Sequence, residues 1–170
     1  MPLQLYKIAS TEVGSAGASS IDFTSVPSGY TDLKLVLSLR GSDANNYVNS
    51  RISFNGSTSG YSSKLLYGTG SGTGSLNNSV TTAVDYSAYG TGSIATANTF
   101  GNTEIYIPNY TSSNNKSLSV DQVSENNATT VITALTAGLW SNSAAINQVT
   151  ITPSVGTFAQ YTTATLYGIL

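Results

Sequence analysis

The feature that most constrains this chain is a hydrophobic alternation with a period of two. The segment TDLKLVLSLR, residues 31–40, carries leucine at every second position, at Leu33, Leu35, Leu37 and Leu39. Successive side chains of a β-strand point to opposite faces of its sheet, so this pattern predicts a strand that is buried on one face only.

The same alternation recurs along the chain, in short segments separated by Gly, Pro and Asn. One segment, residues 129–140, is apolar on both faces, as expected of a central strand of a sandwich. No segment has the pattern of a capped amphipathic helix. The expected strands, eight to ten in number, cover residues 3–13, 20–24, 32–40, 50–54, 63–67, 103–107, 116–122, 129–139, 146–152 and 161–169.

Strands of this number and spacing predict an all-β fold, a single antiparallel β-sandwich domain over residues 1–170. A jelly-roll-like topology is favoured because the strands are many, short and joined by uneven connections. An immunoglobulin-like sandwich is the alternative.

Residues 68–101 interrupt this regular spacing. They are rich in Gly, Ser and Thr, and we expect one long loop or insertion, broken at most by a short strand near Val80–Val84. Four aromatic residues indicate that this loop packs on its own sandwich or on a neighbouring subunit, namely Tyr67, Tyr86, Tyr89 and Phe100.

Charge is scarce, and this limits the possible partners. Only 8% of the residues are charged, the net charge is −2, and nearly half of the chain is Ser, Thr, Asn and Gly. The six cations form no cluster for phosphate binding, no apolar run is long enough to span a membrane, and the N-terminal residues do not resemble a signal peptide. We expect no nucleic-acid partner and no membrane association.

The chain has no His and no Cys. Hydrolase triads normally use His as the base, catalytic zinc sites almost always bind His, and disulfides need Cys. We therefore expect a protein that is not an enzyme and has no cofactor and no metal.

Three weaker signals remain. Glu104 and Asp121 lie on polar faces of expected strands and could form a glycosidase pair if those strands are neighbours, but solvated strand carboxylates explain them better. DANN (43–46) and DQVSENN (121–127) offer oxygen ligands without the spacing of a calcium loop. YGTGSGTGS (67–75) matches no phosphate-binding motif and is expected to be a mobile surface loop.

Tyrosine is the most abundant aromatic residue, with eleven copies. Its ring and hydroxyl suit a wet interface with a sugar or a protein. Trp140 ends the most apolar strand and is expected in the core. The candidate contact residues are Tyr61, Tyr86, Tyr89, Tyr106, Asn109 and Tyr110.

Several segments resemble small virion structural proteins of tailed bacteriophages, of the type found in aquatic and cyanobacterial phages. They are IDFTSVPSGYTDLKLVLSLRGS, ISFNGSTSGYSS, NTFGNTEIYIPNYTSSNNKSLSVDQVSENN and QYTTATLYGIL. The resemblance covers residues 20–66 and 98–170, and it implies a β-rich protein located in the virion, without a catalytic motif.

Within that class two roles compete. A capsid decoration (cement) protein binds the assembled head, and its partners would be the major capsid protein and its own copies in a homotrimer. A tail-fibre or receptor-binding domain would instead recognise a host surface glycan. Decoration is favoured because the chain starts at Met1 and shows no fibrous or tail-docking region. Carbohydrate binding outside a virus is a third possibility, and a glycosidase is a distant fourth.

Overall fold

The computed structural model describes residues 4–78, 80–126 and 130–170, and the regular structure in these ranges is entirely β. None of the described residues belongs to a helix long and apolar enough to cross a membrane. The strands are β1 (Leu5–Glu12), β2 (Ile21–Phe23), β3 (Asp32–Leu39), β4 (Tyr47–Phe54), β5 (Tyr61–Thr69), β6 (Gly72–Asn78), β7 (Val84–Thr91), β8 (Gly101–Ile107), β9 (Lys116–Asn126), β10 (Thr130–Trp140), β11 (Val149–Pro153) and β12 (Thr163–Ile169).

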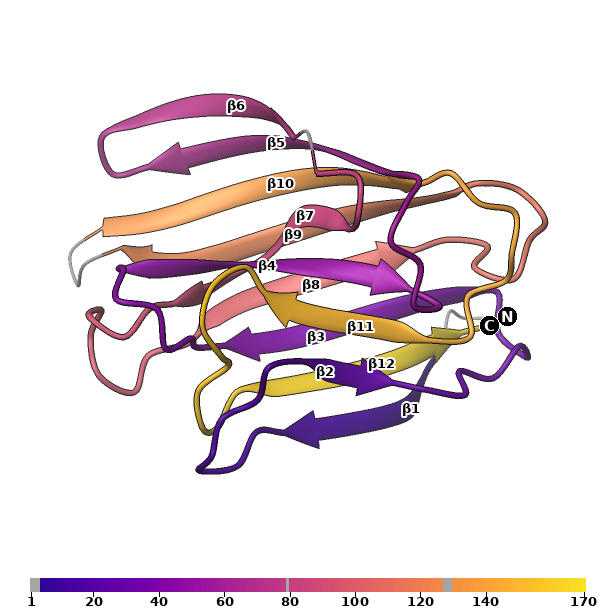
Figure 1. The fold of residues 1–170 in the computed structure, drawn as a ribbon, viewed down its shortest axis with the longest axis horizontal. Helices are drawn as coiled ribbons and strands as arrows, with labels where there is room; N and C mark the ends of the chain where they lie inside the picture. Colours follow the sequence, from indigo (N-terminus) through magenta and orange to yellow (C-terminus); the bar gives the residue numbers. More distant parts are fainter. Residues whose placement is uncertain (1–3, 79, 127–129) are drawn as a thin grey trace.

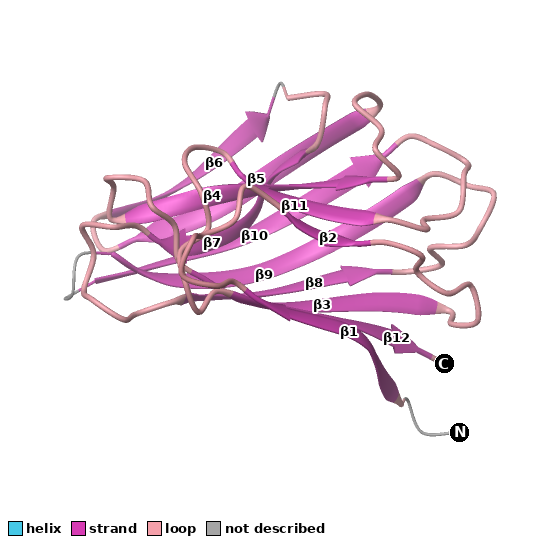
Figure 2. Ribbon diagram, turned by 60° about the horizontal axis from the view of Figure 1, so that its bottom comes forward, coloured by secondary structure: helices cyan, strands magenta, loops and turns pink. Residues whose placement is uncertain are grey.

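The strands form two sheets that pack face to face, as Figure 2 shows from the side. The large sheet has eight strands in the order β1-β12-β3-β8-β9-β10-β5-β6, and the small sheet has four in the order β2-β11-β4-β7. All strand pairs are antiparallel. The expected all-β antiparallel sandwich is therefore confirmed.

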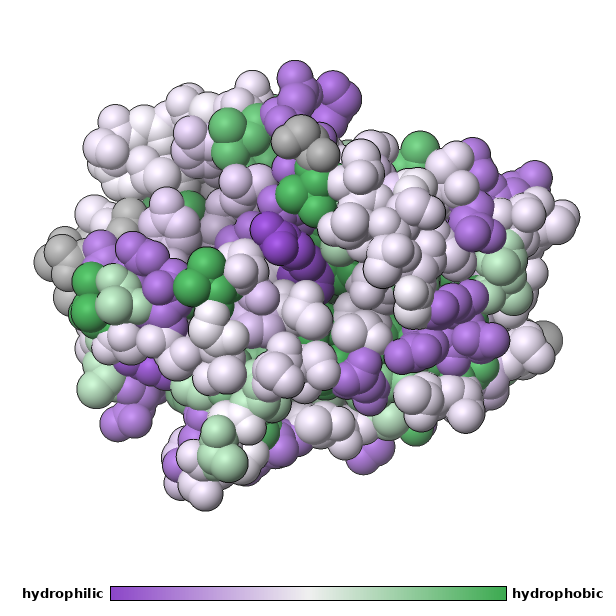
Figure 3. Space-filling view, viewed as in Figure 1, coloured by the Kyte–Doolittle hydropathy of each residue, from purple (hydrophilic) through white to green (hydrophobic). Residues whose placement is uncertain are grey.

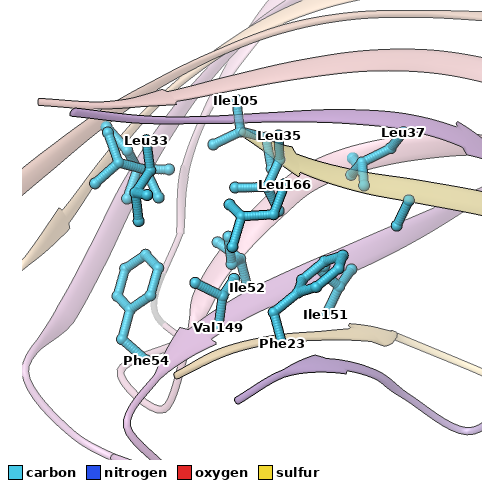
Figure 4. Packing of buried hydrophobic residues seen from close by; sticks show 14 of the residues in the cluster. Phe23, Leu33, Leu35, Leu37, Ile52, Phe54, Ile105, Val149, Ile151 and Leu166 are labelled. Carbon is cyan, nitrogen blue, oxygen red and sulfur yellow. The ribbon is translucent and has the colours of Figure 1, made fainter. Parts of the chain in front are cut away.

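Alternating side chains of both sheets build the core. Leu33, Leu35 and Leu37 of β3 point from the large sheet toward the small sheet, where Phe54 and Ile52 of β4 belong to the same cluster (Figure 4). All five are almost completely buried. Burying one such side chain contributes about 1.5–3 kcal/mol, so the period of two seen in the sequence is also the main source of stability.

Each strand of the small sheet follows and precedes a strand of the large sheet. The chain therefore crosses between the sheets repeatedly, as Greek-key sandwiches do. The finer jelly-roll topology stays a prediction, because the large sheet also contains the hairpin β9–β10 and the outer pair β1–β12.

The long loop expected over residues 68–101 is not present as such. The segment contains the end of β5, all of β6 and all of β7, so the short strand expected near Val80–Val84 lies later in the chain. The run YGTGSGTGS is the turn of the β5–β6 hairpin, with Gly68 paired to Thr73. The sequence hid β6 because Gly, Ser and Asn carry no hydrophobic alternation, although their backbone groups pair as well as any.

The two sheets differ in width, and the hairpin β5–β6 extends beyond β7, the edge strand of the small sheet (Figure 1). A second, smaller core forms beneath this overhang. It contains the buried residues Leu65, Tyr89, Ile132 and Ala134, with Tyr67 and Tyr86 packed against them.

Candidate functional site: a tyrosine cleft and an apolar sheet face

A cleft of about 240 Å³ opens between the overhanging hairpin and the edge of the small sheet. We call it the tyrosine cleft. Its walls are formed by Tyr47, Asn49, Tyr67, Leu76, Tyr86, Tyr89 and Ile132.

Strand register explains how these side chains meet. On β4, Tyr47 and Asn49 alternate with buried Val48, so they face away from the interior of the sandwich. On the large sheet, Tyr67 lies opposite Ala134, whose side chain is buried on the inner face. The cleft therefore joins the outer face of the small sheet to the inner face of the overhang.

The tyrosine rings contact one another. The rings of Tyr47 and Tyr89 lie 5.4 Å apart, edge to face, and those of Tyr86 and Tyr89 lie 6.3 Å apart. Tyr89 is almost completely buried, whereas Tyr47 is 37% exposed and Tyr86 is half-buried. Tyr89 thus supports two rings that remain open to solvent.

A bulge in β7 places Tyr86 at the cleft. The register of β4 and β7 shifts between Ser50 and Ile52, and Tyr86 has a φ of 54°, in the left-handed region. Its carbonyl oxygen accepts hydrogen bonds from Gln122 Nε2 at 2.9 Å and Thr136 Oγ1 at 2.7 Å. A strained residue costs about 1–3 kcal/mol, and such strain persists where surrounding contacts fix it.

One ion pair lies beside the cleft. The buried carboxylate of Asp85 accepts from Arg51 Nε at 3.1 Å and from Asn49 Nδ2 at 2.8 Å, both on Oδ1. Asn49 Oδ1 is buried without a protein hydrogen-bond partner. A buried acceptor without a partner costs about 1–3 kcal/mol.

The phenols of Tyr86 and Tyr89 stay protonated at ordinary pH. Burial raises the pKa of Tyr89 strongly, and burial together with the Asp85 carboxylate raises the pKa of Tyr86. Each hydroxyl can therefore both donate and accept a hydrogen bond.

Of the expected contact residues, Tyr86 and Tyr89 come together here, whereas Tyr61 and Tyr110 belong to the core. Tyr61 stacks on Trp140 with ring centroids 6.0 Å apart, and its hydroxyl accepts from the Phe54 amide at 2.8 Å. Tyr110 is fully buried and donates to the Pro27 carbonyl oxygen. Their expected role as contact residues is corrected, while the expected core position of Trp140 is confirmed.

Tyr106 and Asn109 lie apart from the cleft, and both are bound to Asp32. The Tyr106 hydroxyl donates to Asp32 Oδ2 at 2.6 Å, and the Asn109 amide donates to Asp32 Oδ1 at 2.8 Å. Both residues are exposed, and they stabilise the connection that follows β8.

Two of the weaker signals for chemistry fall on strands β8 and β9. Glu104 and Asp121 are direct neighbours across β8 and β9, as the sequence allowed, and Lys34 Nζ pairs with Glu104 Oε2 at 2.8 Å. Both carboxylates are exposed on a sheet face. DQVSEN is part of β9 rather than a loop, and the last residue of the expected calcium segment, Asn127, lies outside the described residues. Within the described ranges, no three acidic residues group in a way that could hold a metal ion.

The outer face of the large sheet carries an apolar stripe along β10. Leu66 of β5 is 61% exposed and lies directly opposite Leu135 of β10, which is 55% exposed. We define the outer stripe as these two residues with Val123, Val131 and Leu139, all of which are also exposed.

The position of this stripe corrects one expectation. β10 is central in its sheet, between β9 and β5, but its second apolar face is not covered by another layer. A shallow hollow of about 580 Å³ lies beside Leu66 and Leu135, and Gly68 of β5 is among the residues that line it. On the opposite side of the molecule, hydrophobic residues form small patches separated by residues of intermediate hydropathy and by hydrophilic residues (Figure 3).

Sequence reasoning missed Tyr47 and the partners that surround it, because only the strand order brings β4 beside the overhang. The outer stripe had a signal, the apolar character of both faces of residues 129–140. No protein-family model, curated protein or solved structure matches this chain.

Proposed function

We propose that this chain is a non-enzymatic structural protein of a tailed-phage virion, a capsid decoration protein that reinforces the assembled head. The proposal rests on the resemblance of its segments to small phage virion proteins and on its charge-poor, Cys-free composition. Its partners would be the major capsid protein and its own copies in a homotrimer.

The observation that carries the proposal is the outer stripe. Exposed apolar patches with polar surroundings commonly mark protein–protein contact surfaces. Leu66 and Leu135 lie beside Ser, Thr and Gly residues on the β6 side, and the exposed Asp121 of β9 lies directly opposite Leu135 on the other side, so a partner that covers the two leucines meets one charged cross-strand neighbour. Buried charges are costly in such a contact, and their scarcity favours a protein partner.

The test is co-sedimentation of the purified protein with assembled heads that lack it. Leu135→Asp should lower head binding at least about tenfold, because a desolvated charge at an apolar contact costs more than about 1.4 kcal/mol. Val155→Asp is the matched control, since Val155 is 58% exposed but lies outside the outer stripe, and it should bind as the wild type does.

Two results would contradict this role. One is unchanged head binding by Leu135→Asp together with Leu66→Asp. The other is detection of the chain only in the tail fraction when heads and tails of purified virions are separated.

The second candidate is a tail-fibre or receptor-binding domain that recognises a host glycan. The tyrosine cleft favours it, because open aromatic rings beside hydrogen-bonding groups suit a sugar. Tyr110 cannot serve such a site since it is fully buried. Glycan binding should therefore be tested at the tyrosine cleft rather than at Tyr106 and Tyr110.

A further inference from the structure

The tyrosine cleft has the size of a site for one ring. Its volume of about 240 Å³ is below the roughly 300–1,000 Å³ of sites for drug-sized ligands. Leu76 and Ile132 form the apolar wall of the overhang, and the Tyr47 and Tyr86 rings form the other side. The bulge at Tyr86 and the support from Tyr89 hold these rings in place without a ligand.

A second, polar hollow adjoins the cleft. It has a volume of about 340 Å³ and shares Tyr47 and Asn49 with the cleft. Its other walls come from Asp43, Asn45, Asn46 and Ser154. An aromatic surface for a ring therefore continues directly into a surface of amides, one carboxylate and a hydroxyl.

This combination matches the chemistry of a neutral sugar. One face of a pyranose presents C–H groups, which pack on the electron-rich face of an aromatic ring, while its hydroxyls need donors and acceptors at the edge. A phenol can both donate and accept a hydrogen bond, and Tyr47 and Tyr86 place two of them in the cleft beside the amide side chains of the adjoining hollow.

Other ligand classes fit less well. Arg51 is the cation nearest the cleft, and its Nε is already paired with Asp85, so an anionic ligand gains little there. A proline-rich peptide could also pack on tyrosines, but it offers few hydroxyls to the adjoining amide-lined hollow.

We infer that the tyrosine cleft and the hollow adjoining it form a binding site for a neutral saccharide, with Tyr47 and Tyr86 as the stacking rings. The inference deepens the second candidate function and names its site. It is independent of the decoration role, because the cleft and the outer stripe share no residue.

The test is a titration of the full chain with free glucose, galactose, mannose and N-acetylglucosamine and with neutral oligosaccharides built from them, followed by NMR. We expect binding at millimolar concentrations or tighter, with shifts confined to the cleft. Tyr47→Ala or Tyr86→Ala should weaken binding at least about tenfold, whereas Tyr47→Phe should keep most of it because the ring remains.

Tyr161→Ala is the matched control, since Tyr161 is 59% exposed and lies outside the cleft. It should leave binding within about twofold of the wild type, and thermal melts of all variants should show that they are folded. If an alanine variant is unstable, Tyr47→Phe still tests the inference, because it keeps the ring and should therefore keep most of the saccharide binding.

Three outcomes would overturn the inference: no binding of any of these saccharides, binding that Tyr47→Ala and Tyr86→Ala leave unchanged, or occupation of the same tyrosines by a proline-rich peptide alone. If free saccharide inhibits attachment of the protein to intact host cells, the natural ligand is a surface polysaccharide. If the protein binds saccharide but attachment is not inhibited, the natural ligand is a soluble sugar. Co-sedimentation of the Tyr47→Ala variant with assembled heads tests the decoration role separately. This variant should bind heads as the wild type does.

Discussion

At the residue scale, Lys116 is a buried charged side chain whose hydrogen bonds connect two loops. It is only 1% exposed, and its Nζ donates to the carbonyl oxygens of Ser112 at 2.7 Å and Asn114 at 2.5 Å, with Asn142 at 3.4 Å. Burial lowers the pKa of this ammonium group. The cation therefore joins the loop before β9 to the loop after β10.

Lys116→Met should lower the free energy of unfolding by about 2 kcal/mol, because carbonyl groups at this site lose their donor. Urea unfolding at neutral pH measures the change. Lys64→Met is the control, since Lys64 is exposed and bonds only Asn77 in the hairpin, and its effect should stay within about 0.5 kcal/mol. Equal effects of the two substitutions would show that the buried contacts of Lys116 do not stabilise the fold.

Single residues also show how far the sequence could predict the site. The buried leucines and isoleucines followed from alternation alone. Alternation placed Glu104 and Asp121 on polar strand faces, but only the strand order shows that they are neighbours. The roles of the tyrosines did not, because Tyr61 and Tyr86 both lie in or near the Gly-rich part of the sequence and nothing there distinguishes them. Their exposure depends on which strand lies across from them.

At the scale of elements, β10 depends on one glycine. A methyl group at Gly138 would lie 2.7 Å from a Val84 methyl carbon and 2.9 Å from Leu118 Cγ. Side chains of β7 and β9 therefore lie directly against the backbone of β10 at this point, where the two sheets pack against each other.

Gly138→Ala should destabilise the protein by about 1–3 kcal/mol, because an added carbon in a filled core forces its neighbours apart. The matched substitution is Gly72→Ala in β6, where no atom lies within 4 Å of the new carbon. It should be neutral or stabilise by up to about 1 kcal/mol by restricting the unfolded chain. Thermal unfolding of both variants provides the comparison, and a Gly138→Ala variant as stable as the wild type would contradict the close packing.

The elements divide into those with a hydrophobic pattern and those without one. β3, β8 and β12 carry alternating apolar residues, and their positions followed closely from the sequence. β6 pairs with one neighbouring strand, β5. Its sequence is mostly Gly, Ser and Asn, which carry no hydrophobic alternation, so no sequence signal indicated this strand. The cleft depends on β6 and on the bulge in β7, and for this reason it could not be predicted as a unit.

At the scale of the whole molecule, the unequal width of the sheets creates both candidate surfaces. Eight strands cannot be covered by four, so the inner face of β5 and β6 extends beyond the small sheet and forms one wall of the cleft. The outer face of the same strands, with β10, carries the outer stripe. A sandwich with two equal sheets would have buried the first surface.

The pH dependence of stability is also a property of the whole chain. It has no His and no Cys, the side chains whose ordinary pKa lies between about 6 and 9, so we expect little change in stability over that range. Above it tyrosine dominates. Burial raises the pKa of Tyr61, Tyr86, Tyr89 and Tyr110, and the bond to Asp32 raises that of Tyr106.

A group whose pKa is raised by folding stabilises the protein fully below its unfolded pKa, here about 10, and loses this contribution as the pH rises through its folded pKa. The free energy of unfolding should therefore fall above pH 10, by about 1.4 kcal/mol per pH unit for each tyrosine that ionises only in the unfolded chain. Lys116 acts in the opposite sense, because its pKa is lowered by folding, but it is one group against five. Urea titrations between pH 7 and 11 measure the slope, and Tyr89→Phe should make it less steep. An equally steep slope in Tyr89→Phe, or constant stability up to pH 11, would mean that the buried phenols do not determine the alkaline limit of this fold.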